Sequence, residues 1–128
     1  NASEDKNTRR VVHSIQKELI VLCAEVATSI AGRGKIRERV AEDSICVLEK
    51  EIDYLEGKRA VRMRSFCIPG EGAASSALDV ARAITRRAER RSVTLLKKGM
   101  VKNPKIVIYL NRLSDLLYLL ARFNEEKR

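Results

Sequence analysis

Apolar residues recur every three or four positions along most of the chain, and no segment sustains the alternation of apolar and polar residues that is typical of strands. This spacing predicts four helices, over residues 5–30, 38–55, 75–98 and from 103 onward. The first predicted helix has an apolar stripe at Ile15, Leu19, Leu22, Val26 and Ile30. The second has one at Ala41, Ile45, Leu48, Ile52 and Leu55. Such helices with short or moderate connections indicate one all-α domain over residues 1–128, an antiparallel up-and-down helical bundle.

Residues that stop or start helices bound these four segments. The expected stops are the glycines Gly32, Gly57 and Gly99. Ser75 or Ser76 is expected to cap the third helix, and Asn103 to cap the fourth, with Pro104 in its first turn. The segment 32–35 (Gly-Arg-Gly-Lys) lacks the upstream strand of a phosphate-binding loop, so we interpret it as an interhelical turn.

The two later helices each combine an apolar face with a polar one. In the third helix the predicted packing face consists of Ala77, Val80, Ile84, Ala88 and Leu95. At about 100° per residue, Arg82, Arg86 and Glu89 fall on the other side. In the fourth helix the predicted packing face consists of Ile106, Tyr109, Leu113, Leu116, Leu117 and Leu120. Its opposite side carries Asn111, Asp115, Tyr118 and Arg122.

Charge and composition narrow the range of partners. Lys and Arg total 26 against 17 Asp and Glu, a net charge of +9, which makes nucleic acid, acidic lipid or a polyphosphate ligand plausible. Aromatic residues make up only 4%, with no Trp, which lowers the expectation of single-stranded nucleic-acid binding. No apolar run approaches the roughly 20 residues that a bilayer span needs, so we expect a cytoplasmic protein without a membrane partner.

Catalytic and metal-binding patterns based on Cys and His are weak. The three cysteines, Cys23, Cys46 and Cys67, are widely spaced, which argues against a disulfide framework or a zinc cluster and favours small buried hydrophobes in a reducing compartment. His13 is the single histidine, and we assign it no role. No Ser/His/Asp or Cys/His set indicates nucleophilic catalysis.

The segment 82–91 is the strongest candidate for chemistry, with five arginines and one glutamate in ten residues. One interpretation is a solvated helix surface on which Glu89 pairs with Arg82 or Arg86. The other is a set of guanidinium groups that bind a carboxylate or phosphate in bidentate fashion. Asn111 and Asp115, one turn apart in the fourth helix, are a second polar candidate.

Several blocks together carry a family resemblance. They are Phe66-Cys67-Ile68-Pro69-Gly70, Ser75-Ser76-Ala77-Leu78, the segment 82–91, Tyr109-Leu110-Asn111-Arg112-Leu113-Ser114-Asp115 and Leu120-Ala121-Arg122. In order and spacing they resemble the propanediol-utilisation-type ATP:cob(I)alamin adenosyltransferases. The resemblance implies transfer of the 5′-deoxyadenosyl group of ATP to cob(I)alamin, with Mg²⁺, release of triphosphate, and a reductase that supplies electrons to cobalt. It also implies a ferritin-like five-helix bundle assembled as a homotrimer, with active sites between subunits and no nucleic-acid partner.

The resemblance also assigns roles to single residues. The residues implied for ATP binding are Arg86, Arg87, Glu89, Arg90 and Asn111. Arg82 is expected to pair with an acidic residue of the neighbouring subunit, and Asp115 to support the site. Phe66 is expected to cover the lower face of the corrin, and it is implied in catalysis together with Arg86. The resemblance leaves the ligands of the metal open.

The amino end departs from the family pattern. Family members carry a Thr-Gly-Asp-type glycine loop and a first helix that complete the ATP pocket, and neither is found in the sequence from Asn1 onward. We therefore expect a single adenosyltransferase-like domain without its amino-terminal ATP-loop segment. The alternative function is a noncatalytic basic helical-bundle module that binds RNA or an acidic protein.

Overall fold

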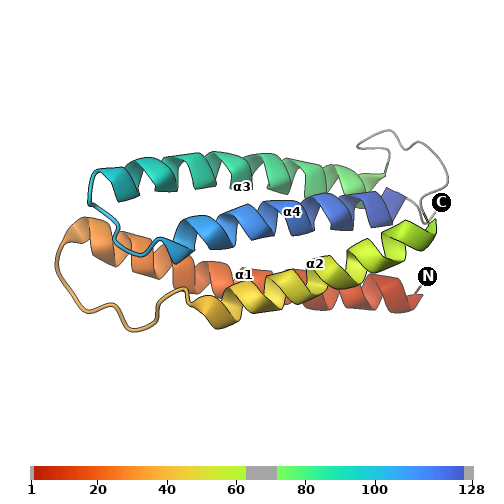
Figure 1. The fold of residues 1–128 in the computed structure, drawn as a ribbon, viewed down its shortest axis with the longest axis horizontal. Helices are drawn as coiled ribbons and strands as arrows, with labels where there is room; N and C mark the ends of the chain where they lie inside the picture. The colour runs from red at the N-terminus through yellow and green to blue at the C-terminus, as the bar shows by residue number, and fades with distance from the viewer. Residues whose placement is uncertain (1, 63–71, 126–128) are drawn as a thin grey trace.

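The computed structural model describes residues 2–62 and 72–125, and within them it contains four helices and no strand. The helices are α1 (Ala2–Ala31), α2 (Glu42–Arg62), α3 (Ala73–Lys97) and α4 (Lys105–Glu125). All four lie along the long axis of the molecule, with the start of α1 and the end of α4 at the same end (Figure 1). The predicted all-α bundle is confirmed, whereas a ferritin-like topology and a fifth helix stay predictions. None of the described helices is long and apolar enough to cross a membrane.

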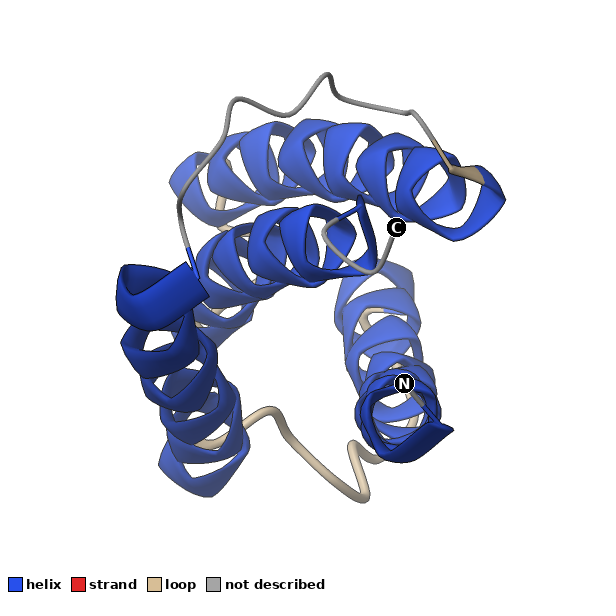
Figure 2. Cartoon of the chain, turned by 90° about the vertical axis from the view of Figure 1, so that its right-hand side faces the viewer, coloured by secondary structure: helices blue, strands red, loops and turns tan. Residues whose placement is uncertain are grey.

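Helix α4 is the centre of the bundle. It lies between α3 and α2 and packs against both (Figure 2). Its whole predicted apolar face is buried, confirming that prediction, and the burial extends round the helix to Leu110, Ser114, Leu119 and Ala121. Because other helices cover it on two sides, α4 has no fully solvated face over most of its length.

Helices α1 and α2 supply the other half of the apolar core. The predicted stripe of α2 is buried at Ile45, Leu48, Ile52 and Leu55, and α1 contributes Ile15 and Leu22. The buried stripe of α2 begins later than predicted, because Ala41 lies before the helix, and that of α1 ends sooner, because Ile30 is 45% exposed. Gly57 lies inside α2 and does not end it. One glycine inside a helix lowers helix stability by only about 1 kcal/mol relative to alanine. The flanking residues Glu56 and Lys58 are good helix formers, so α2 continues through Gly57.

The predicted packing face of α3 is only partly right. Val80 and Ile84 are 59% and 52% exposed, although Ala88 and Leu95 pack against the core. The buried residues of α3 are instead Ser75, Thr85 and Ser92. Thr85 follows Ser75 by ten residues and Ser92 follows Thr85 by seven, so all three fall on one side of α3, where their small size lets the backbones of α3 and α4 come close. The helix is therefore turned so that the border of its arginine side, rather than its most apolar stripe, faces α4.

Local contacts at the helix ends follow the predicted caps in part. The Asn103 side-chain oxygen accepts a hydrogen bond from the Lys105 amide at 3.1 Å, so the predicted cap of α4 is confirmed. The prediction that Ser75 or Ser76 caps α3 is wrong, because Gly72 is the N-cap residue, and Ser75 lies in the first turn, where its hydroxyl accepts a hydrogen bond from the Gly72 amide at 3.0 Å. Cys23 and Cys46 are exposed, so the prediction that they are buried is wrong for both. Cys67 and Phe66 lie outside the described residues.

Candidate anion-binding surface on α3 and α4

A line of polar contacts joins α3 to α4, and we call it the polar seam. It consists of Asp79, Arg82 and Glu89 from α3 with Asn111, Tyr118 and Arg122 from α4. The Arg122 guanidinium donates to Asp79 at 2.6 Å, and the Asn111 amide donates to Glu89 at 3.2 Å. These pairs run in opposite order along the two helices, so α3 and α4 have opposite directions. The same register places Arg86 level with Ser114 and Asp115.

Tyr118 organises the arginines at one end of the polar seam. The Arg82 guanidinium carbon lies 5.3 Å from the centre of the Tyr118 ring, and that of Arg122 lies 5.0 Å from it. Both are within the range of a cation–π contact. Arg122 is only 9% exposed and is compensated by Asp79. Arg82 has no carboxylate partner among the described residues, so the ring fixes its position while its charge stays available.

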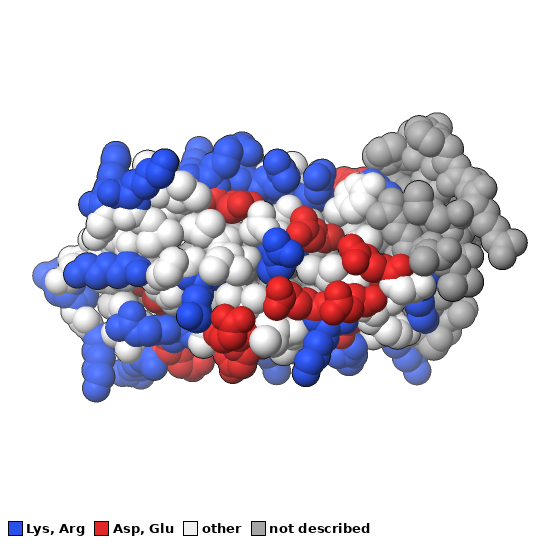
Figure 3. Space-filling model, viewed as in Figure 1, with Lys and Arg blue, Asp and Glu red and all other residues white. Residues whose placement is uncertain are grey.

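Four further arginines of α3 are exposed: Arg86, Arg87, Arg90 and Arg91. Within the described chain none of these side chains forms an ion pair or hydrogen bond. The ion pair of Glu89 with Arg82 or Arg86 is not formed, because Glu89 accepts a hydrogen bond from Asn111 instead. Lys and Arg side chains line the upper edge of the molecule, over α3 (Figure 3). Clustered guanidinium groups without carboxylates favour binding of an anion from solution.

The structure brings together most of the predicted site residues but not all. Arg82, Arg86, Glu89 and Arg90 fall within roughly 100° of one another on α3 at its helical pitch. Asn111 and Asp115 border this side from α4. Arg87 projects roughly 60° beyond Arg90 on the same helix. It therefore lies at the border of the surface that the other predicted ATP residues share, whereas Phe66 lies outside the described residues.

Arg112 is a member of this surface to which the sequence analysis gave no role. One of its nitrogens donates to the Asn111 side-chain oxygen at 2.6 Å, and another lies 3.7 Å from Asp115. Asn111 is thus held on both sides, by Glu89 and by Arg112. The sequence did contain a sign of this contact, because Arg112 and Asp115 are three residues apart and such residues are neighbours on a helix.

Two carboxylates near the arginines suit a magnesium ion that is shared with phosphate. Glu89 uses one oxygen for Asn111, and Asp115 is exposed with a single contact at 3.7 Å to Arg112. Mg²⁺ is commonly held by one or two carboxylates together with substrate phosphates and water. Glu89 and Asp115 are therefore the described residues of this surface that could contribute a carboxylate oxygen to Mg²⁺ bound with phosphate.

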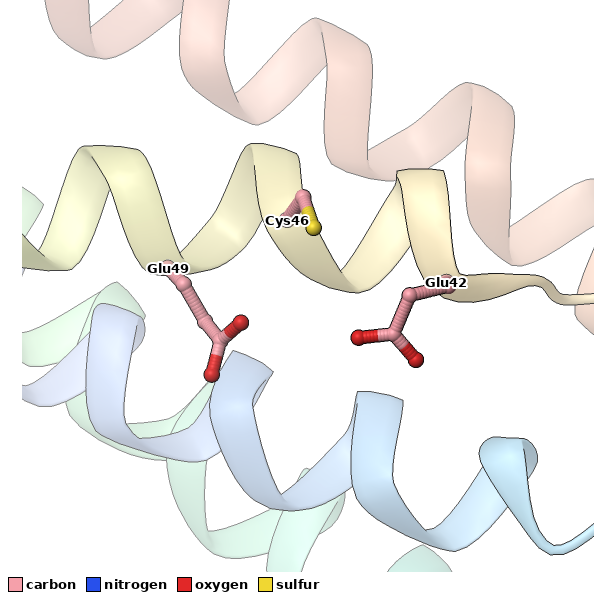
Figure 4. Close-up of side chains that lie close together, drawn as sticks. All are labelled: Glu42, Cys46 and Glu49. Carbon is pink, nitrogen blue, oxygen red and sulfur yellow. The ribbon is translucent and has the colours of Figure 1, made fainter.

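Glu42, Cys46 and Glu49 form a separate group on one side of α2 (Figure 4). Their possible ligand atoms all lie within 4.8 Å of one another. The sequence analysis missed this group, although its i, i+4, i+7 spacing was visible. Glu42 opens α2, where the helix dipole stabilises negative charge without a metal ion.

A small cavity of about 200 Å³ lies where α1, α2 and α4 meet. Glu18, Ser44 and Tyr109 line it, and the Ser44 hydroxyl donates to Glu18 at 2.7 Å. Burial, together with the negative charge of Glu18, raises the pKa of the Tyr109 hydroxyl well above its usual value. The phenol is therefore neutral over the physiological pH range.

The described helices form an all-α bundle with a surface of exposed arginines on α3. A family model for cobalamin adenosyltransferases matches residues 1–124, and the chain belongs to that family. It is 37% identical over 117 residues to a corrinoid adenosyltransferase of Citrobacter freundii, covering 91% of this chain and 65% of the relative. It is 37% identical over 121 residues to the corrinoid adenosyltransferase PduO of Salmonella typhimurium, covering 94% of this chain and 35% of the relative.

A mammalian relative is similar over a shorter region. The corrinoid adenosyltransferase MMAB of Bos taurus is 42% identical over 83 residues, which is 65% of this chain and 34% of the relative. The chain thus spans between about a third and two thirds of the length of these curated relatives. The resemblance read from the sequence blocks is confirmed at the level of the family.

Proposed function

We propose that the protein transfers the 5′-deoxyadenosyl group of ATP to cob(I)alamin, forming adenosylcobalamin and releasing triphosphate. The observation that carries the proposal is the set of exposed α3 arginines without carboxylate partners, found in a chain of the cobalamin adenosyltransferase family. Three named relatives are corrinoid adenosyltransferases, which supports the same reaction here. The alternative, a noncatalytic module that binds RNA, would require only positive surface charge. It does not explain the specific contacts of the polar seam.

The reaction explains why the surface is rich in arginine and poor in acid–base groups. The cobalt(I) electron pair forms the new cobalt–carbon bond to the ribose 5′-carbon. The bond from that carbon to the phosphate oxygen breaks, and its electron pair leaves with triphosphate. The protein has to align the two substrates and stabilise the negative charge on the leaving group. We assign the second task to Arg86 and Arg90, which are exposed and have no carboxylate partner in the described chain, and the nucleophile needs no protein base.

The contacts of the polar seam support the residue roles that the family implies. Glu89 and Asn111 hold each other, so both present fixed polar groups beside Arg86 and Arg90 to ATP and its Mg²⁺. Asp115 supports this arrangement through Arg112. We assign Arg87 to ATP as well, because it lies next to Arg86 in the chain and about 60° from Arg90 around α3. Phe66 is assigned to the lower face of the corrin.

The exposed apolar side of α3 supports assembly into a homotrimer with sites between subunits. Val80 and Ile84 are more than half exposed and lie one turn apart. Burying them against a second copy would remove apolar surface from water. Arg82, fixed by Tyr118 and without a carboxylate partner in the described chain, is available for an acidic residue of that copy. We further propose a cytoplasmic setting and a reductase that supplies the cobalt electron.

Adenosylation of chemically reduced cobalamin tests this proposal. The protein is mixed with ATP, Mg²⁺ and cob(I)alamin, and the loss of the cob(I)alamin spectrum is followed. We expect Arg86→Ala to lower kcat/KM by about 100-fold, the scale for removing one charge-stabilising donor. Arg91→Ala is the matched control, because Arg91 is exposed on another side of the same helix. Equal rates in both variants would contradict the role of Arg86, and no adenosylcobalamin together with tight RNA binding would overturn the reaction.

A further inference from the structure

A second pocket lies at the end of the bundle opposite the start of α1, between the α1–α2 and α3–α4 connections. We call it the end pocket. Its volume is about 400 Å³, and residues 28–39 and 99–102 supply its walls. Both connections lie at the left-hand end of the molecule in Figure 1. The end pocket is thus built from two segments that are far apart in the sequence.

All charged side chains that line the end pocket are positive. Arg33, Arg39 and Lys102 line it, and none of its lining residues is Asp or Glu. Arg39 lies 3.8 Å from the buried Glu25, whereas Arg33 and Lys102 form no ion pair within the described chain. Lysines and arginines also gather on the surface around this end (Figure 3). The two unpaired cations, Arg33 and Lys102, match a ligand with at least two negative charges.

The two walls are tied together by a buried network, so the pocket is formed before any ligand arrives. Glu25 is 1% exposed and accepts hydrogen bonds from the Val40 amide at 2.8 Å and the Asn103 side chain at 3.0 Å. The Asn103 side chain also donates to the Val40 carbonyl at 2.8 Å. Preorganisation of this kind lowers the entropic cost of binding.

The backbone at the end pocket also suits an anion. Gly32 and Gly34 have φ values of 69° and 91°, in the left-handed region that favours glycine. The amides of Arg33 and Gly34 donate no hydrogen bond within the described chain. Free backbone amides beside a left-handed residue form concave donor sites for phosphate oxygens. Ile30 and Met100, both more than 40% exposed, give an apolar border for the rest of the ligand.

We propose that the end pocket binds a small molecule that carries a pyrophosphate- or triphosphate-type group. Arg33 and Lys102 contact the phosphate oxygens, and the Arg33 and Gly34 amides donate to them. This pocket is distinct from the α3 surface, from which it differs in its residues and its place in the bundle. The proposal does not depend on adenosyl transfer.

The test is a titration of the ¹⁵N-labelled protein with inorganic pyrophosphate, followed by NMR. We expect saturable shifts of the Gly32, Gly34 and Gly99 amides. The double variant Arg33→Gln/Lys102→Gln should weaken binding at least about tenfold, a loss of about 1.4 kcal/mol. Arg9→Gln/Lys17→Gln is the control, since it removes the same charge from exposed positions of α1 outside the pocket.

A second variant keeps the test decisive if the first one unfolds. Met100→Glu places a negative charge at the border of the pocket, on a side chain that is 42% exposed, and should also weaken binding. Arg86→Ala should leave the glycine shifts unchanged, which separates this site from the α3 surface. Shifts that never saturate, equal weakening in the control, or shifts confined to α3 would overturn the proposal.

Discussion

The side of α4 that faces α2 and the side that faces α3 differ in the kind of contact that they make. Toward α2 it packs leucines and Tyr109 against a regular stripe of buried isoleucine and leucine. Toward α3 it meets small residues, partly buried leucines of α3 and the polar seam, where polar groups are paired across the interface. Apolar contact on the α2 side does not fix the direction of any polar group. Directional contacts on the α3 side fix the positions of Glu89 and Arg82, and we expect them to contribute less to stability.

The largest expected effect is loss of the apolar centre of α4. Leu116 is fully buried, and Leu116→Ala should lower the free energy of unfolding by about 2–5 kcal/mol because it leaves a cavity. Ile108→Ala is the control on the same helix, since Ile108 is 46% exposed and should cost within about 0.5 kcal/mol. Urea unfolding measures both. Similar losses would mean that the α2 side of α4 is not the stabilising one.

A smaller loss is expected from the ion pair at the end of the polar seam. Asp79→Ala removes the carboxylate 2.6 Å from the mostly buried Arg122. Because the Asp79 side chain is 26% exposed, we expect a loss of about 1–3 kcal/mol, below that of a fully buried pair. Asp53→Ala makes the same change of charge at an exposed position of α2. A loss for Asp79→Ala no larger than for Asp53→Ala would show that the pair does not hold α3 to α4.

The cation–π contact of Arg82 should matter more for function than for stability. Tyr118→Leu should cost about 0.5–1 kcal/mol of stability, the scale of an exposed cation–π contact. If Arg82 makes the subunit contact, the variant should also dissociate at higher protein concentration than the parent. Sedimentation equilibrium measures this, with Tyr118→Phe as the control that keeps the ring. Unchanged assembly in Tyr118→Leu would remove Tyr118 from the positioning of Arg82.

The contrast between the two sides of α4 also explains what the sequence could predict. The apolar face of α4 and the stripe Ile45, Leu48 and Ile52 could be predicted, because their apolar residues recur at the helical period and are the residues that are buried. The buried side of α3 is not visible in this way, because Ser75 and Ser92 are buried for their small size. Val80 and Ile84 also fit the helical period, yet they are exposed. The reason is that α4 packs against the border of the arginine side of α3 and not against the side that carries Val80 and Ile84.

The candidate site could be predicted only in part, because some of its contacts depend on how helices pack and not on a local sequence pattern. The arginine content of segment 82–91 and the spacing of Asn111 and Asp115 marked candidate residues, but their roles came only from the family resemblance, and Arg112 was missed. The pairing of Glu89 with Asn111, in place of an arginine on its own helix, depends on the register between α3 and α4. The end pocket depends on the meeting of residues 28–39 with residues 99–102, which no local pattern reports.

The substitution with the smallest expected effect on stability at neutral pH is Tyr109→Phe, on the apolar side of α4. Burial and Glu18 raise the pKa of this hydroxyl in the folded state, so the folded protein holds the proton more firmly than the unfolded chain. The resulting stability is fully present below the unfolded pKa of about 10 and is lost as the pH rises beyond it. Tyr109→Phe should therefore change stability little at neutral pH and make its decline above about pH 10 shallower.

Urea unfolding of the parent and of Tyr109→Phe, at neutral pH and above pH 10, measures this difference. Glu18→Gln removes the second cause of the raised pKa and keeps burial, so its alkaline decline should lie between those of the parent and Tyr109→Phe. Parallel declines in all three proteins would mean that Tyr109 does not titrate with unfolding. The side of α4 away from the polar seam would then hold no group that links stability to alkaline pH, and its contribution would be purely apolar.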